Sequence, residues 1–312
     1  MTPLKTENPL AGRNPSRMRR DGCIVCGTDF SARSTEAANA ALAVAMPLKQ
    51  PLLLVHSMAE TFREELPASA RDSLIPLMYE RLCADAERLR ALGANVETAI
   101  LNGLPDDGVA AFVRDCRSAL LVVGKTGHEI VERCLTGNVA EVLAESSPVP
   151  TLVVHSAVPF EAWSRGVRPL RVLVAADLDP AADAAIRWVN ELRRMGPCEV
   201  TVAHVVRGSG AEERRLHEAE MKEKATALLG GENVAIRVMR GAVRVHRRIV
   251  ALAGETRADL LVIGTHQRHG IERLLHPSVS RAILRHSPVS VACVPSPLDA
   301  ALPVPPQLIF RS

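Results

Sequence analysis

Three glycines within residues 120–143 have the spacing of a loop that binds an anion. The segment begins with the apolar run Leu120–Val123, and Gly124 and Gly127 follow it. Nine residues separate Gly127 from Gly137, where a helix is expected to begin. Glycine lets the backbone approach a phosphate without a Cβ clash, and a helix N-terminus offers unpaired N–H groups. The pattern predicts a nucleotide site at this loop.

Lys125 and Thr126 follow Gly124, and the three residues resemble the end of a Walker A phosphate loop, G-x-x-x-x-G-K-[ST]. The first glycine of that motif is missing, because Ala119 stands five positions before Gly124 and the residues between them are the apolar strand. The segment is therefore not expected to be a P-loop. Lys125 is expected either to reach a phosphate as a point charge or to lie in solvent.

Two other patterns suggest a metal site but lack the right geometry. Cys23 and Cys26 form a C-x-x-C within an expected strand, where side chains three apart point to opposite faces and cannot readily share a metal. We expect both thiols to be buried as small hydrophobes. His266, His269 and His276 have no nearby cysteine or carboxylate to complete a zinc set, and we interpret them as loop residues.

The composition indicates a soluble protein of two domains. Its 312 residues are 47% hydrophobic and 23% charged, which suits packed domains of about 150 residues each. A net charge of +3 and an aromatic fraction of 3% argue against a nucleic-acid partner. No apolar run reaches the ~20 residues of a membrane helix, so no membrane partner is expected. Seven cysteines without framework spacing indicate a reducing, cytoplasmic location.

Apolar runs of strand length alternate with helix-favouring segments in the first half of the chain. The expected strands are residues 23–27, 52–55, 96–101, 120–123 and 151–154. The expected helices are residues 31–44, 77–92 and 109–116, with a fourth starting near residue 137. This alternation predicts right-handed crossovers and a parallel sheet covered on both faces. The proline-containing stretch 67–76 is expected to be a surface loop.

The second half repeats the first at equal intervals, which indicates a tandem duplication. A His follows an Asp by 27 residues in both halves, as Asp29 and His56, and as Asp177 and His204. A proline follows the glycine after the fourth strand by 24 residues in both halves, as Gly124 and Pro148, and as Gly264 and Pro288.

The repeat divides the chain into two expected domains, residues 21–158 and 168–297, with a linker near residues 159–169. Residues 1–20 are expected to be a flexible basic arm, since they carry five Lys and Arg residues without the apolar core of a secretory signal. Residues 298–312 are expected to be a proline-rich, extended tail.

The chain resembles the universal stress protein family, here with two domains in tandem. The resemblance rests on an Asp that closes the first strand, a His after the second strand, and the motif G-x-x-G, nine residues, then G and a small polar residue. The resemblance implies two Rossmann-like (adenine nucleotide alpha hydrolase-like) domains of the α/β class. Each would have a five-stranded parallel sheet, helices on both faces, and ATP where the strand order reverses. The resemblance also implies a set of nucleotide contacts, to which we add Lys125 as a candidate phosphate ligand. The full set is Asp29, Ser57, Gly124, Lys125, Gly127, Gly137, Asn138 and Val139.

The two copies depart from the family pattern to different degrees. Asn138 stands where the family prefers Ser or Thr, and Ser57 where it often has Val, but backbone contacts remain available at both positions. In the second copy, Gln267 and Pro277 replace two of the three glycines. Proline removes an N–H from a loop that must present N–H groups. We expect the second copy to be degenerate and structural, packing on the first as two single-domain members pair.

The first hypothesis is a cytoplasmic stress-response protein that binds ATP, with or without Mg²⁺, in its N-terminal domain and regulates an unknown protein partner. The family commonly pairs through the last strand, which favours a homodimer of four domains. The alternatives are a nucleotide-independent scaffold, and an ATPase or nucleotidyl transferase. No catalytic motif is present, and although Asp29 could position a metal or water, no dedicated base is identified. Any enzymatic activity is therefore expected to be no more than slow ATP hydrolysis.

Overall fold

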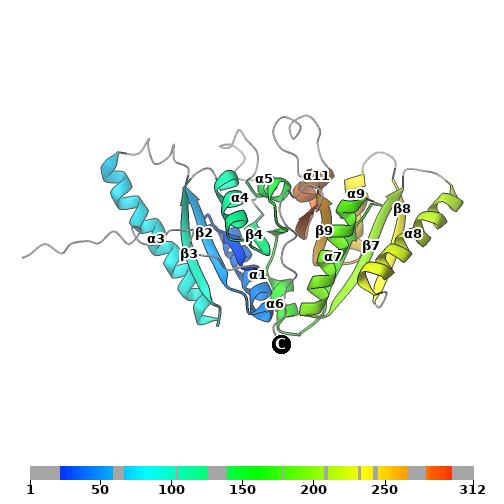
Figure 1. The fold of residues 1–312 in the computed structure, drawn as a ribbon, viewed down its shortest axis with the longest axis horizontal. Helices are drawn as coiled ribbons and strands as arrows, with labels where there is room; N and C mark the ends of the chain where they lie inside the picture. The colour runs from blue at the N-terminus through cyan, green and yellow to red at the C-terminus, as the bar shows by residue number, and fades with distance from the viewer. Residues whose placement is uncertain are drawn as a thin grey trace, which may run out of the picture.

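The computed structural model describes residues 22–58, 67–102, 105–125, 139–177, 179–206, 210–230, 233–241, 245–265 and 279–296. These residues form one long, curved sheet with helices on both of its faces (Figure 1). The predicted basic arm and the predicted proline-rich tail lie outside the described residues.

Strands and helices alternate along both halves, as predicted. The elements of the first half are β1 (Ile24–Gly27), α1 (Ala32–Leu48), β2 (Leu52–Met58), α3 (Ala68–Ala91), β3 (Val96–Asn102), α4 (Pro105–Asp115), β4 (Leu120–Gly124), α5 (Val139–Ser146) and β5 (Thr151–Val154). The next elements are α6 (Val158–Ser164), β6 (Leu170–Ala175), α7 (Pro180–Met195), β7 (Cys198–Val206), α8 (Ala211–Leu229), β8 (Val234–Arg240), α9 (Val245–Glu255), β9 (Leu260–Thr265), α11 (Val279–His286) and β10 (Ser290–Pro295).

The first helix of each half starts close to the end of the first strand because a side chain caps it. The Ser31 hydroxyl accepts a hydrogen bond from the backbone N–H of Ser34 at the start of α1. At the start of α7, the Asp179 carboxylate accepts one from the N–H of Ala182 at 2.8 Å. These caps satisfy N–H groups that a helix leaves unpaired at its N-terminus.

The sheet has ten strands in the order β3-β2-β1-β4-β5-β10-β9-β6-β7-β8. Within each half all the pairs are parallel, and the strand order is the same on the two sides of the junction. The junction is the antiparallel pair of β5 and β10, in which Leu152 lies opposite Ala292. The α/β prediction of five parallel strands per half is confirmed, and the last strands join the two copies as the resemblance implied.

Two apolar layers cover the sheet, and each layer contains residues of both halves. One layer holds α1, α3, α6, α7 and α8, and the other holds α4, α5, α9 and α11. Cys23 and Cys26 are fully buried, and they belong to opposite layers. The prediction of buried thiols on opposite faces of a strand is therefore confirmed.

Two segments differ from what the sequence predicted. Residues 67–76, expected to be a surface loop, include the first turns of α3, and Pro76 lies within that helix. Proline is tolerated at the start of a helix, and inside a 24-residue helix Pro76 removes a single backbone hydrogen bond. The expected linker contains α6, whose Phe160 and Trp163 are each 2% exposed. This connection between the halves is therefore part of the core.

Among the helices that the structure describes, none combines the length and the apolar character needed to cross a bilayer.

Candidate functional site

The carboxyl ends of β1, β2 and β4 meet at one edge of the sheet in the first half. Gly27 pairs with Val55, so Asp29 and Ser57 each lie two residues beyond a matched pair. Gly124 ends β4, which is the neighbour of β1 on its other side. The chain leaves β1 towards β2 on one side and reaches β4 and β5 on the other. This reversal of strand order is the usual ligand crevice of such folds.

Asp29 is exposed at this edge and is held by the turn into α1. One of its carboxylate oxygens accepts a hydrogen bond from the backbone N–H of Ser31 at 3.0 Å. Desolvation would raise the pKa of Asp29, but hydrogen bonds from Ser31 and Ser34 outweigh it and hold the pKa below its ordinary value. The carboxylate is therefore ionised at neutral pH and can accept a hydrogen bond from an amine.

An aromatic and cationic group lies beside Asp29, and the sequence interpretation missed it. The ring of Phe30 is 4.6 Å from the ring of His56, and the guanidinium of Arg81 lies 5.1 Å from the centre of Phe30. His56 is fixed in turn by a 2.8 Å hydrogen bond between its Nδ1 and the Thr28 carbonyl. Phe30 is one of only five phenylalanines, and its place next to Asp29 was the signal available in the sequence.

Ser57 lies within a strand rather than after it. The apolar run predicted a strand that ends at Val55, whereas β2 continues to Met58 and pairs Ser57 with Leu101 of β3. Periodicity could not show this extension, because His56 and Ser57 are polar and only half-buried. Ser57 stays at the edge where Asp29 and Gly124 lie.

Gly124 is required by the packing of α1. A Cβ atom at this position would lie 2.6 Å from the carbonyl oxygen of Arg33. Gly264 is in the same situation in the second half, where a Cβ atom would overlap the backbone carbonyl of Ala181 near the start of α7. The glycine at the end of the fourth strand therefore lets the first helix of each half approach the sheet.

Lys125 is half-buried, and it contacts the second half of the chain. Its ammonium group donates a 2.6 Å hydrogen bond to the backbone carbonyl of Ser287, 162 residues away. Burial lowers the pKa of Lys125, and the nearby charge of Arg33 lowers it further. The sequence predicted either a phosphate or solvent beside Lys125, whereas the structure places a carbonyl of the other copy there.

A second cation lies close to Lys125. Arg33 donates a 3.4 Å hydrogen bond to the His155 carbonyl. Burial lowers the pKa of His155, and so do the charges of Lys125 and Arg33. Arg33 and Lys125 thus place two positive charges beside the end of β4, and such charges attract an anion.

The remaining predicted contacts are only partly described by the structure. Val139 is the first residue of α5 and packs against the core. Gly127, Gly137 and Asn138 lie outside the described residues, as do Gln267, Pro277 and the three loop histidines of the second copy.

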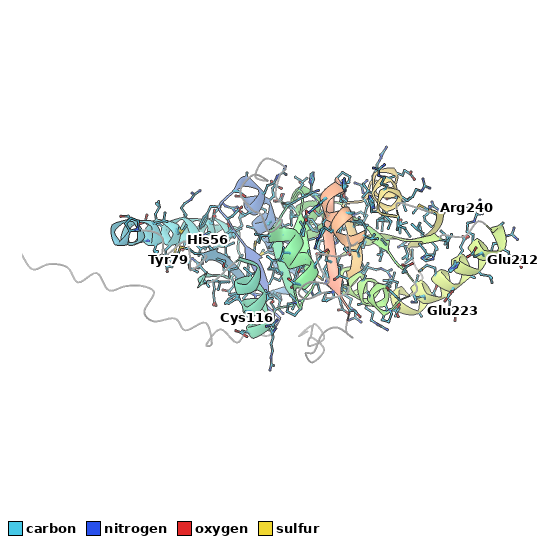
Figure 2. The ribbon with its side chains drawn as sticks, turned by 90° about the horizontal axis from the view of Figure 1, so that it is seen from above. His56, Tyr79, Cys116, Glu212, Glu223 and Arg240 are labelled. Atoms are coloured by element: carbon cyan, nitrogen blue, oxygen red, sulfur yellow. The ribbon has the colours of Figure 1, made fainter. Side chains whose placement is uncertain are left out.

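The matching edge of the second half is arranged differently. Asp177 contacts His204 at 3.2 Å, and His204 Nδ1 lies 3.0 Å from the Ala176 carbonyl. The ring of His217 on α8 lies 5.1 Å from that of His204. Here the strand-one carboxylate contacts a buried imidazole of its own half. In Figure 2 the outer charges of this half, such as Arg240 and Glu212, lie at the opposite end of the molecule from His56.

The contact between His204 and Asp177 predicts a pH effect on stability. The hydrogen bond that the His204 imidazole donates to the Asp177 carboxylate raises the pKa of His204, against the effect of burial. The stabilisation is complete below the unfolded-state pKa of about 6.5 and is lost as the pH rises through the folded-state pKa. Asp177→Asn should lower the His204 pKa in an NMR titration and flatten the dependence of unfolding free energy on pH in this range. Asp29→Asn, the matched change in the first half, should alter neither the His204 pKa nor this pH dependence. An unaltered His204 titration in Asp177→Asn would contradict the contact between His204 and Asp177.

Within the part of the chain that the structure describes, no three His, Cys, Asp or Glu side chains converge as a metal site.

Comparison with known proteins agrees with this architecture. A profile of the universal stress protein family matches residues 23–155 and again residues 170–295. A universal stress protein of Methanocaldococcus jannaschii is 29% identical over 136 residues, which are 42% of this chain and 80% of the relative. The crystal structure of a universal stress protein from Archaeoglobus fulgidus DSM 4304 has the same fold, with a TM-score of 0.71 at 20% identity over 88% of this chain and 96% of that chain. A universal stress protein in complex with cAMP is 25% identical over 44% of this chain and 98% of its own, with a TM-score of 0.36. The chain belongs to the universal stress protein family and carries two of its domains in tandem.

Proposed function

We propose that this universal stress protein binds an adenine nucleotide, ATP, at the carboxyl edge of β1, β2 and β4 in its first half. The observation that carries the proposal is the placement of opposite charges on two neighbouring strand ends. The ionised Asp29 follows β1, while the cations Arg33 and Lys125 lie where β4 ends. An adenine amine and a phosphate chain are complementary to these two groups.

Each candidate residue has a distinct role in this proposal. Asp29 accepts a hydrogen bond from the adenine amine, and the backbone of Ser57 borders the base. Lys125 has two ammonium N–H groups besides the one directed at Ser287, and these are donors for phosphate oxygens. The phosphates, with or without Mg²⁺, are held by the glycine motif, whose contacts are Gly124, Gly127, Gly137, Asn138 and Val139.

The second half is proposed to bind no nucleotide. Asp177 already contacts His204, and Thr265 stands where the first half has Lys125. Gln267 and Pro277 replace two motif glycines. These differences occupy one oxygen of the Asp177 carboxylate with His204 and remove the cation and part of the backbone nest that the first half offers.

A matched pair of aspartates tests the site. At a concentration of 100 Kd, ATP should stabilise the native protein by about 2.7 kcal/mol, which thermal unfolding detects. Asp29→Ala should weaken ATP binding about tenfold to hundredfold, as expected for loss of a hydrogen bond to a charged group. Asp177→Ala, the same change in the second half, should bind ATP as the native protein does.

Three outcomes would overturn this proposal. In the first, the native protein shows neither co-purified adenine nucleotide nor stabilisation by ATP. In the second, Asp29→Ala binds ATP as tightly as the native protein does. In the third, Asp177→Ala is the variant that loses ATP binding. The first outcome favours a nucleotide-independent scaffold, a reading that the Lys125–Ser287 contact also supports. Sustained ATP turnover that Asp29→Ala abolishes would instead indicate an enzyme.

The regulatory role and the assembly are part of the same proposal. ATP occupancy would change how the protein meets a protein partner in a cytoplasmic stress response. The last strands β5 and β10 pair within the chain, so a homodimer would have to form through another surface. The outer strands β3 and β8 are the edges of the sheet.

A further inference from the structure

Helix α11 of the second half contacts the residues on both sides of segment 126–138 of the first half. Lys125 precedes that segment, and α5 follows it. Figure 1 shows α5 and α11 side by side at the junction of the two halves. Three contacts join α11, with Ser287 directly after it, to these flanks: Lys125 with Ser287, Glu141 with Arg285, and Glu145 with Arg281. We call this set the α11 clamp.

The first contact places a cation at the end of α11. Ser287 follows the last residue of α11, and its N–H donates to the Ile283 carbonyl at 2.8 Å, which continues the helical pattern. Its own carbonyl belongs to the group that a helix leaves unpaired at its C-terminus, where the helix dipole is negative. The ammonium of Lys125 satisfies this carbonyl and lies at the favourable end of the dipole.

The other two contacts are ion pairs at the junction of the halves. Arg285 Nε donates to both carboxylate oxygens of Glu141, at 3.0 and 3.1 Å. Arg281 donates to Glu145. The side chains of Glu141 and Glu145 are only 10% and 8% exposed. Each carboxylate is thus largely removed from water and is paired with an arginine, which offsets the cost of burying its charge.

The ion pairs connect positions that the duplication makes equivalent. Glu141 and Glu145 lie 17 and 21 residues after Gly124, and Arg281 and Arg285 lie at the same distances after Gly264. The residue 17 positions after the glycine in one copy pairs with the residue 21 positions after the glycine in the other copy. A two-fold axis requires this exchange of positions. Two identical copies of the first half would place carboxylates against carboxylates. The charges therefore select one first half and one second half as partners.

We propose that the second half positions the nucleotide site of the first half through the α11 clamp. The proposal rests on the function proposed above, and it gives the degenerate copy a role in binding. The lysine contact of the clamp runs only from the first half to the end of α11. In the second half Thr265 stands at the position of Lys125 and offers no ammonium group to the end of α5. Arg281 and Arg285 are positioning residues in this scheme: they act on the site through α5.

The physical consequence is a lower cost of binding. Holding Lys125 and α5 in place before the ligand arrives removes part of the entropy cost of fixing these groups on binding. The coupling is reciprocal, so bound ATP must stabilise the contacts between α5 and α11 to the same extent.

Charge reversal and charge exchange test the clamp in the full chain. Arg281→Glu with Arg285→Glu should raise the Kd for ATP about tenfold, within the usual range of coupling between sites. It should also speed amide hydrogen exchange in α5 without ATP. The fourfold variant that adds Glu141→Arg and Glu145→Arg restores opposite charges and should return both properties towards native values. Arg285→Gln is a milder version, expected to act in the same direction.

The matched control is Arg194→Glu, which breaks an exposed ion pair with Glu191 within α7. It should change neither the Kd nor exchange in α5. The proposal is overturned if the reversed variants bind ATP as tightly as native protein, or if the fourfold variant does not recover. If native protein binds no ATP, the proposed function fails on its own. Amide hydrogen exchange then tests the clamp by itself. Loss of protection in α5 in the charge-reversed variant, with recovery in the fourfold variant, supports the clamp, and unchanged protection overturns it.

Discussion

Gly264→Ala is expected to destabilise the protein by about 3 kcal/mol, at the upper end of the range for overpacked cores. The added Cβ would overlap the carbonyl of Ala181, which is backbone near the start of α7 and cannot rotate away. Gly124→Ala should act in the same direction through Arg33 of α1, where the contact of 2.6 Å is slightly less severe. Urea unfolding followed by circular dichroism measures both effects.

The control for the glycine variants is Gly254→Ala in α9. A Cβ atom there meets nothing within 4 Å, and alanine is favoured over glycine inside a helix by about 1 kcal/mol. The variant should be neutral or slightly stabilising. If Gly264→Ala proved as stable as Gly254→Ala, the close approach of α7 to β9 would be wrong.

These expectations change how the first motif glycine should be used in experiments. Any side chain at Gly124 is expected to displace α1, so loss of ATP binding in such a variant would not identify a phosphate contact. Asp29→Ala is the better probe, because Asp29 is exposed and its matched residue Asp177 provides a control in the same chain.

Trp163→Ala is the second large effect that we expect, a loss of about 3–5 kcal/mol. Trp163 lies on α6, is 2% exposed, and belongs to the apolar layer that both halves share. Its removal leaves a cavity in this shared layer, so both halves should unfold at lower urea concentration in one transition. Circular dichroism follows this transition without relying on the tryptophan signal.

Trp163→Phe separates packing from hydrogen bonding at this position. Among the described residues, Nε1 of Trp163 is buried without a hydrogen-bond partner. Phenylalanine keeps most of the apolar volume and removes this unsatisfied N–H, so the loss should be well below that of Trp163→Ala. Equal stability of Trp163→Ala and native protein would show that α6 is only a connection.

Much of the fold could be predicted because it is written in local patterns. Apolar runs such as Leu52–Val55 and Thr151–Val154 identify buried strands wherever they lie in the chain. The repeated interval from Asp to His showed the duplication, and the glycine spacing led to the family. The prolines at residues 67–76 predicted a loop, but a long helix tolerates one proline at its N-cap and another inside.

The candidate site was predictable only in part. Asp29, Ser57 and Gly124 do come to one edge of the sheet, because parallel strands place their carboxyl ends together. The neighbours of Asp29 were not predictable: Arg81 of α3 reaches Phe30 from far along the chain. A side-chain contact of this kind has no periodic signature in the sequence.

The sequence alone determined most of the strands and helices, the duplication and the family, since these depend on residue types at regular intervals. Only the tertiary structure decided what the duplication achieves. It joins β5 to β10, turns Lys125 towards Ser287, and matches two glutamates with two arginines of equivalent position. These contacts join residues more than 130 positions apart. Their formation depends on how two finished sheets meet, which no local pattern encodes.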